Sequence, residues 1–105
     1  MAVRVRVQVS GRVQGVGFRW AVEDAARAES VTGWVRNLPD GCVEAVFEGN
    51  EEQVQRMVEF CRRGPAAARV ENVLASHLTV LELRPFGPSH RPGDSGEFDG
   101  FSILQ

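Results

Sequence analysis

Apolar and polar residues alternate strictly at the start of the chain. Valines stand at positions 3, 5, 7 and 9, separated by arginine or glutamine. A period of two with β-branched residues on one side is typical of a half-buried strand. Glycines at 11, 15 and 17 end this pattern, and from Phe18 to about Glu29 the apolar residues recur at helical spacing. The chain is therefore expected to open with a strand, a glycine-containing loop and a helix.

The middle of the chain predicts a hairpin and a second helix. Residues 31–37 and 42–47 are expected to be strands, because a Leu-Pro-Asp-Gly turn sequence separates them. Asn50 is a favourable N-cap, with Gln53 three residues later in the position of a capping box. The helix that follows should end at Gly64, since glycine followed by proline is a helix stop signal.

The last third of the chain completes the predicted fold. Residues 70–83 should contain a fourth strand, residues 84–100 a long loop with three prolines and four glycines, and residues 101–104 a short last strand. The pattern does not fix the pairing of that strand or the role of the loop. The order βαββαβ plus a short strand predicts an α+β fold, the ferredoxin-like split βαβ sandwich. We expect a single domain over residues 1–105, with an antiparallel-rich sheet and two helices on one face.

Composition and charge narrow the possible partners. The net charge of −2 argues against a general nucleic-acid binder. All four charged residues among the first 20 are arginines, a local positive bias that could attract an anion. No apolar run approaches the roughly 20 residues that cross a bilayer, so no membrane partner is expected.

Cys42 and Cys61 form no motif and are expected to be small buried apolar residues. A cytoplasmic location and a monomeric state are the default expectations.

The segment from Gly11 to Arg19 has the composition of an anion-binding loop. Glycines permit backbone conformations in which successive N–H groups point into one space, and a helix start adds unpaired donors. Arg19 adds a planar fork that suits phosphate oxygens. These features predict that residues 11–19 form an anion-binding site, which we call the cradle. The alternative that spacing leaves open is a glycine-rich connection beside a solvated arginine.

Three familiar phosphate motifs are missing from this segment. A Walker loop requires a lysine, and the chain has none. A dinucleotide fingerprint requires a third glycine where Trp20 stands. A cysteine-nucleophile loop would need cysteine at position 13, which is Val13. If the loop supports hydrolysis, water is therefore the nucleophile.

Asn37 is the candidate partner of the cradle. Two strands joined by a helix run in the same direction, so the end of the second strand should lie at the same sheet edge as the loop. The amide of Asn37 could hold a water aimed at phosphorus. The alternative is that Asn37 only caps the following turn.

Two motifs together resemble the acylphosphatase family. Residues 9–19 (Val-Ser-Gly-Arg-Val-Gln-Gly-Val-Gly-Phe-Arg) look like its signature, and residues 32–41 resemble its second motif at the expected distance. The resemblance runs from about residue 3 to Val73 and returns at residues 98–103. It implies a hydrolase that needs no metal or cofactor and splits acyl phosphates into carboxylate and inorganic phosphate by attack of water.

The resemblance also implies residue roles. Arg19 would bind the phosphoryl oxygens and Asn37 would position the water, while the substrate itself accepts the water's proton. The loop residues that would bind phosphate are Gln14, Gly15, Val16, Gly17, Phe18 and Arg19. Residues 75–96 are longer than the family's usual connection, and the chain end lacks the basic residue often found there.

Other functions have weaker support in the sequence. The same cradle could serve a non-catalytic anion-binding or regulatory module, or a carbamoyl-phosphate-handling domain like that of hydrogenase maturation factors. RNA binding is not expected, because the first strand carries no aromatic residue. His77 and His90 do not have metal-ligand spacing relative to the cysteines, so no metal site is expected. We expect Trp20 and Trp34 to pack in the core or at its rim rather than to stack on a ligand.

Overall fold

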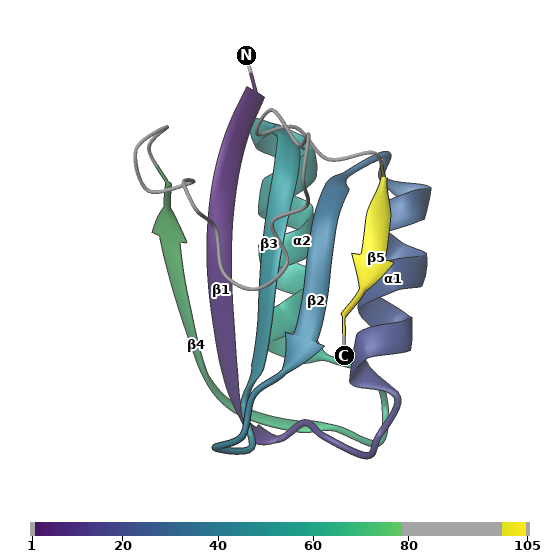
Figure 1. The fold of residues 1–105 in the computed structure, drawn as a ribbon, viewed down its shortest axis with the longest axis vertical. Helices are drawn as coiled ribbons and strands as arrows, with labels where there is room; N and C mark the ends of the chain where they lie inside the picture. The colour runs from purple at the N-terminus through teal and green to yellow at the C-terminus, as the bar shows by residue number, and fades with distance from the viewer. Residues whose placement is uncertain (1, 79–99, 105) are drawn as a thin grey trace.

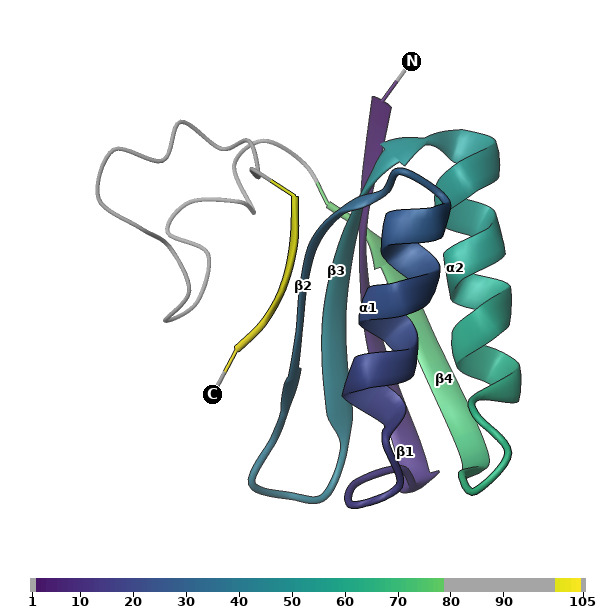
Figure 2. The same cartoon turned by 90° about the vertical axis from the view of Figure 1, so that its right-hand side faces the viewer.

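The computed structural model describes residues 2–78 and 100–104, which form a sheet layer and a helix layer (Figures 1 and 2). The helices α1 and α2 pack on one face of a five-stranded sheet. This arrangement confirms the predicted ferredoxin-like sandwich. In chain order the elements are β1 (Ala2–Arg12), α1 (Phe18–Ala28), β2 (Thr32–Asn37), β3 (Val43–Asn50), α2 (Glu51–Arg63), β4 (Arg69–His77) and β5 (Phe101–Ile103).

The strand order across the sheet is β4-β1-β3-β2-β5. All pairings are antiparallel except that of β5, which runs parallel to β2 with Phe101 opposite Gly33. The last strand, whose partner the sequence left open, therefore closes the edge beside β2. The predicted fourth strand is observed as residues 69–77, and the predicted loop lies outside the described residues except for Gly100.

The core lies between the sheet and the helices. The valines that alternate along β1 point to this side, and Val7 and Val9 are fully buried. Phe18 and Val22 of α1 meet them there. β5 is fixed to the same core because the Phe101 ring stacks on Phe47, with ring centroids 5.7 Å apart. Apolar burial of this extent is the main driving force for the fold.

The other face of the sheet is more buried than simple alternation suggests. Arg4 is only 8% exposed, and its guanidinium contacts Glu48, its direct cross-strand neighbour, at 2.8 Å. Arg36 contacts Glu44 at 2.7 Å. Cross-strand pairs of opposite charge explain why polar residues occupy these positions.

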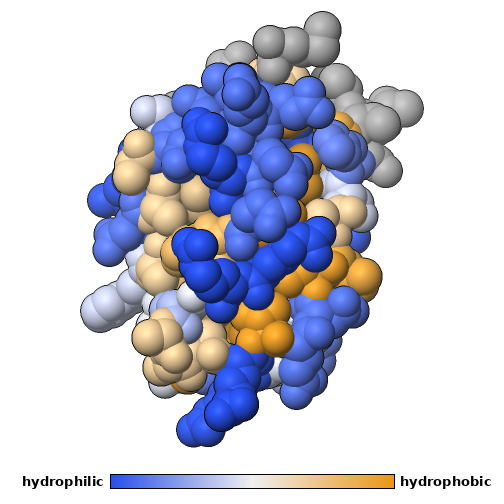
Figure 3. Space-filling model, turned by 180° about the vertical axis from the view of Figure 1, so that it is seen from behind, coloured by the Kyte–Doolittle hydropathy of each residue, from blue (hydrophilic) through white to orange (hydrophobic). Residues whose placement is uncertain are grey.

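The outer surface of the helical layer combines hydrophilic side chains with apolar areas that lie between them (Figure 3). On α2 the inward positions are apolar, and charged residues such as Glu52, Arg56 and Glu59 point outward. Within residues 2–78 and 100–104, no helix combines the length and apolarity that crossing a bilayer demands.

Candidate active site

The loop between β1 and α1 leaves main-chain donors available. Gly15 has φ +74° and Gly17 has φ +80°, in the left-handed region that other residues adopt only at a cost. Among the hydrogen bonds of the described residues, none uses the N–H groups of residues 15–17. These groups remain available to a ligand.

The two helices begin in different ways. α2 has a complete capping box between Asn50 and Gln53, followed by two glutamates in its first turn. α1 has Gly17 at its N-cap, no side-chain cap and no acidic residue in its first turn. The first N–H groups of a helix have no partner within it, and its dipole end is positive. The N-cap and first turn of α1 therefore supply no negative group of their own.

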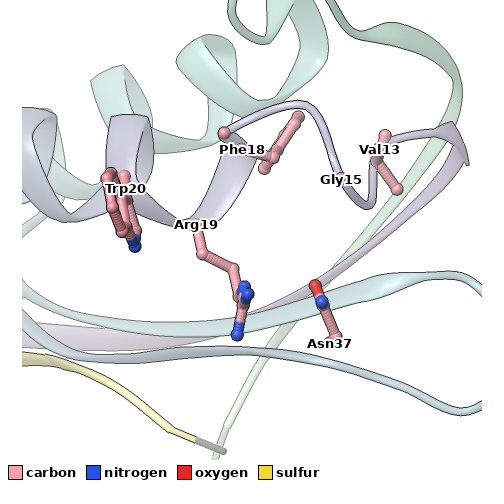
Figure 4. Close-up of a pocket in the computed structure, with 7 residues that line it drawn as sticks. Val13, Gly15, Phe18, Arg19, Trp20 and Asn37 are labelled. Atoms are coloured by element: carbon pink, nitrogen blue, oxygen red, sulfur yellow. The ribbon is translucent and has the colours of Figure 1, made fainter.

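A cavity of about 270 Å³ opens at this helix start (Figure 4). It brings together Arg19, from the first turn of α1, and Asn37, from the last position of β2. These are the two residues that the sequence singled out as catalytic. The cavity is lined by Val13, Gly15, Gly17, Phe18, Arg19, Trp20 and Asn37.

Within the described residues, the side chains of Arg19 and Asn37 make no hydrogen bond or ion pair. In the part of the chain that the structure describes, no carboxylate or other hydrogen-bond partner contacts the Arg19 guanidinium. Oδ1 of Asn37 is buried and accepts no hydrogen bond from the described residues. A buried acceptor without a partner costs about 1–3 kcal/mol. A ligand or water in the cavity would remove that cost.

Gln14 ties the loop to the β2–β3 turn. Its side-chain Nε2 donates to the carbonyl oxygens of Leu38 and Cys42, each at 2.8 Å. The turn is closed from within by Leu38 N–H donating to Cys42 O at 2.8 Å. Because Leu38 follows Asn37 directly, Gln14 links the position of Asn37 to that of the loop.

The predicted phosphate-binding residues divide into two groups. Gly15, Gly17, Phe18 and Arg19 line the cavity. The side chain of Gln14 is engaged with the turn, and Val16 packs against the core, so both can face a ligand only through their main chain.

Two cavity residues are not among the predicted site residues. Val13 is buried, and Trp20 is 72% exposed beside Arg19. Trp34 is buried, which confirms the expectation of core or rim packing for this residue. Trp20 is exposed, so the expectation that it packs in the core is wrong. The place of Trp20 next to Arg19, in the first turn of α1, is the signal that could have marked it.

None of the described residues that line this cavity is acidic or carries a thiol. Among the described residues, no group of three His, Cys, Asp or Glu side chains lies close enough together to hold a metal ion. Among the described residues that line the cavity, the polar groups are the Arg19 guanidinium, the Asn37 amide and main-chain groups.

Comparison with known proteins points to one family. The acylphosphatase family model matches residues 5–85. An acylphosphatase of Roseiflexus sp. (strain RS-1) is 59% identical over 96% of this chain and 94% of its own length. One from Gloeobacter violaceus is 57% identical over 85% of this chain and 90% of its own.

A solved structure leads to the same family. The crystal structure of acylphosphatase from Bacillus subtilis superposes with a TM-score of 0.78 at 34% identity, and each chain is covered completely. Both motifs that resemble the family, residues 9–19 and 32–41, lie inside the matched segment and meet at one cavity. The chain therefore belongs to the acylphosphatase family of hydrolases.

Proposed function

We propose that this cavity hydrolyses the carboxyl–phosphate bond of acyl phosphates by direct attack of water, without metal or cofactor. Arg19 and the N–H groups of residues 14–19 hold the phosphoryl oxygens, and Asn37 holds the attacking water. The observation that carries the proposal is the meeting of an uncommitted guanidinium and an unpaired buried amide oxygen at an uncapped helix start.

The proposed step is a single displacement at phosphorus. The water oxygen forms a bond to phosphorus while the bond from phosphorus to the carboxyl oxygen breaks. The electron pair of the broken bond leaves with the carboxylate. One water proton passes to a phosphoryl oxygen of the substrate, so the products are a carboxylate and protonated inorganic phosphate.

The proposed groups match the demands of this reaction. Oδ1 of Asn37 accepts a hydrogen bond from the water and so orients an oxygen lone pair toward phosphorus. Arg19 and the loop donors stabilise the charge on the equatorial oxygens in the transition state. An acyl phosphate already has a good leaving group, so positioning and electrostatics suffice without a covalent intermediate.

Substitution of Arg19 tests the binding role. We expect Arg19→Ala to weaken competitive inhibition by inorganic phosphate and to lower kcat/KM for benzoyl phosphate by about 10²–10³-fold. Arg19→Lys keeps the charge but not the planar guanidinium with its paired N–H donors, so its kcat/KM should lie between those of the wild type and Arg19→Ala. Arg62→Ala on the exposed side of α2 is the matched control and should leave both constants unchanged. The phosphate-binding role of Arg19 would be contradicted if Arg19→Ala and Arg62→Ala had the same inhibition constant for phosphate and the same kcat/KM.

Substitution of Asn37 separates positioning from binding. We expect Asn37→Ala to lower kcat by about 10²-fold or more, while the inhibition constant of phosphate changes little, because the amide holds water rather than phosphate. Asn72→Ala, at an exposed position of β4, serves as the control. Unchanged turnover in Asn37→Ala would remove the water-positioning role.

The alternative of a non-catalytic anion-binding module makes a different prediction. In that case the wild-type protein would bind phosphate but would not accelerate benzoyl phosphate hydrolysis. Assays in the presence of EDTA decide between the two and also test metal independence. Activity that EDTA abolishes and a divalent cation restores would contradict the metal-free mechanism.

We further propose that residues 1–105 act as one domain and as a monomer in the cytoplasm, with no nucleic-acid partner. The large exposed apolar side chains of the described residues, Trp20 and Leu74, stand on α1 and β4, which do not contact each other. Such isolated residues do not form the patch that a stable interface requires. Cys42 and Cys61 are free thiols, which is usual in a reducing compartment. Light scattering would test the monomer.

A further inference from the structure

We propose that Trp20 is the surface on which the acyl group of the substrate rests, and that it gives the enzyme a preference for acyl phosphates with a flat aromatic acyl group. This inference rests on the proposed roles of Arg19 and Asn37, because it places the acyl group relative to those two residues.

Trp20 has free apolar surface at the edge of the cavity. Three large apolar side chains line the cavity, and two of them, Val13 and Phe18, are each 1% exposed, so their surface is already used in the core. Trp20 is 72% exposed. An indole presents a large rigid face whose stacking on another ring is favourable beyond the area it buries. Of these three side chains, Trp20 is the one that can still cover a ligand.

The cavity has room for more than the reacting group. A phosphoryl group with its attacking water fills roughly the space of five waters, about 150 Å³ at about 30 Å³ each. The cavity measures about 270 Å³. The remaining space exceeds what an acetyl group needs and approaches the roughly 150 Å³ at which apolar protein cavities accept benzene. A ring that is partly open to solvent and covered on one face by Trp20 fits this space.

The direction of the reaction also points to Trp20. Attacking and leaving oxygens lie roughly in line on opposite sides of phosphorus. In Figure 4 the side chain of Arg19 lies between those of Asn37 and Trp20. If phosphorus is held at Arg19 and water arrives from Asn37, the carboxyl oxygen leaves toward Trp20. The acyl group attached to that oxygen then meets the indole.

The test compares an aromatic with a small aliphatic substrate. The ratio of kcat/KM for benzoyl phosphate to that for acetyl phosphate is measured in the wild type, Trp20→Ala and Trp20→Phe. We expect Trp20→Ala to lower this ratio about tenfold and Trp20→Phe, which keeps a ring, to stay within about threefold of the wild type. The ratio of the inhibition constants of benzylphosphonate and inorganic phosphate should rise about tenfold in Trp20→Ala.

A matched control and a clear contrary result complete the experiment. Leu74→Ala removes another exposed large apolar side chain, on a strand that does not contact α1, and should leave both ratios unchanged. Ratios in Trp20→Ala equal to those of the wild type would overturn the inference. That result differs from failure of the proposed function, in which the wild type would hydrolyse neither substrate.

Discussion

At the scale of single residues, Cys61 shows how strongly burial acts on one group. It lies on the inner side of α2 and has no exposed surface. Burial raises the pKa of the Cys61 thiol to about 12, because the thiolate would lose its hydration. The chain has no tyrosine and no lysine, the side chains that titrate near pH 10 in most proteins. Cys61 is therefore unusually important for stability in alkaline solution.

We predict that the free energy of unfolding falls above about pH 9. The unfolded thiol ionises from about pH 9, whereas the folded thiol keeps its proton up to about pH 12, so the unfolded state binds fewer protons in this window. Stability then decreases with pH, by about 2 kcal/mol between pH 8 and 10.5. Urea unfolding at pH 8 and at pH 10.5 measures this decrease in the free energy of unfolding.

Cys61→Ala provides the comparison for this prediction. The variant should start from a lower stability, because a small cavity replaces the sulfur. It keeps Cys42, so the difference in pH dependence between the two proteins isolates Cys61. An identical decrease in both proteins would contradict the assignment.

The residues of the site could be predicted from sequence only in part. Arg19 and Asn37 could be named because they lie in the two motifs that resemble the family, and the topology placed both at one edge of the sheet. The two contacts of the Gln14 side chain depend on how the loop folds against the β2–β3 turn. Those contacts join segments more than 20 residues apart, and no local pattern encodes them.

At the scale of elements, the loop and the hairpin behave as one unit because Gln14 joins them. We predict that Gln14→Ala lowers kcat about tenfold, since Asn37 loses its fixed position relative to the loop. Two lost hydrogen bonds should also cost about 1–3 kcal/mol of stability. Both carbonyl oxygens keep a bond within the turn, so the hairpin itself should survive.

The measurement is a comparison of kcat with phosphate inhibition. Gln55→Ala, which removes an exposed glutamine from α2, is the control for the loss of a glutamine side chain. A purely structural role of Gln14 would lower stability and leave kcat at the wild-type value. In that case the link from the loop to Asn37 would have no part in turnover.

Local rules predicted most elements but not all of their pairings. The capping box of α2 forms as expected from Asn50 and Gln53, and Gly64 ends the helix. The parallel pairing of β5 with β2 could not be predicted, because three residues carry too little pattern to choose a neighbour. The stacking of Phe101 on Phe47 supplies the missing specificity, and it exists only in the folded sheet.

At the scale of the whole molecule, the proposed site couples ligand binding to global stability. A ligand that binds only the folded state stabilises it by about 2.7 kcal/mol at 100 times its Kd. For a domain of this size that corresponds to a rise in Tm on the order of 10 °C. We predict such a rise with inorganic phosphate, measured by thermal unfolding at constant ionic strength.

Arg19→Ala distinguishes specific binding from a general salt effect. The variant should show less than about a third of the wild-type shift, since it lacks the charged ligand of the phosphate. Equal shifts in the two proteins would mean that phosphate acts by exclusion from the surface rather than by occupying the cavity.

The lack of a side-chain cap at the N-terminus of α1 has a consequence for the catalytic cycle. The Asn50 side chain caps α2, whereas the first turn of α1 has no side-chain cap and, under the proposed function, would be capped by the bound anion. Under the proposed function, the substrate would act as a temporary cap of the helix that holds it, and release of the product would remove that cap. Each turnover would tighten and loosen one end of a single helix while its neighbour stays constant.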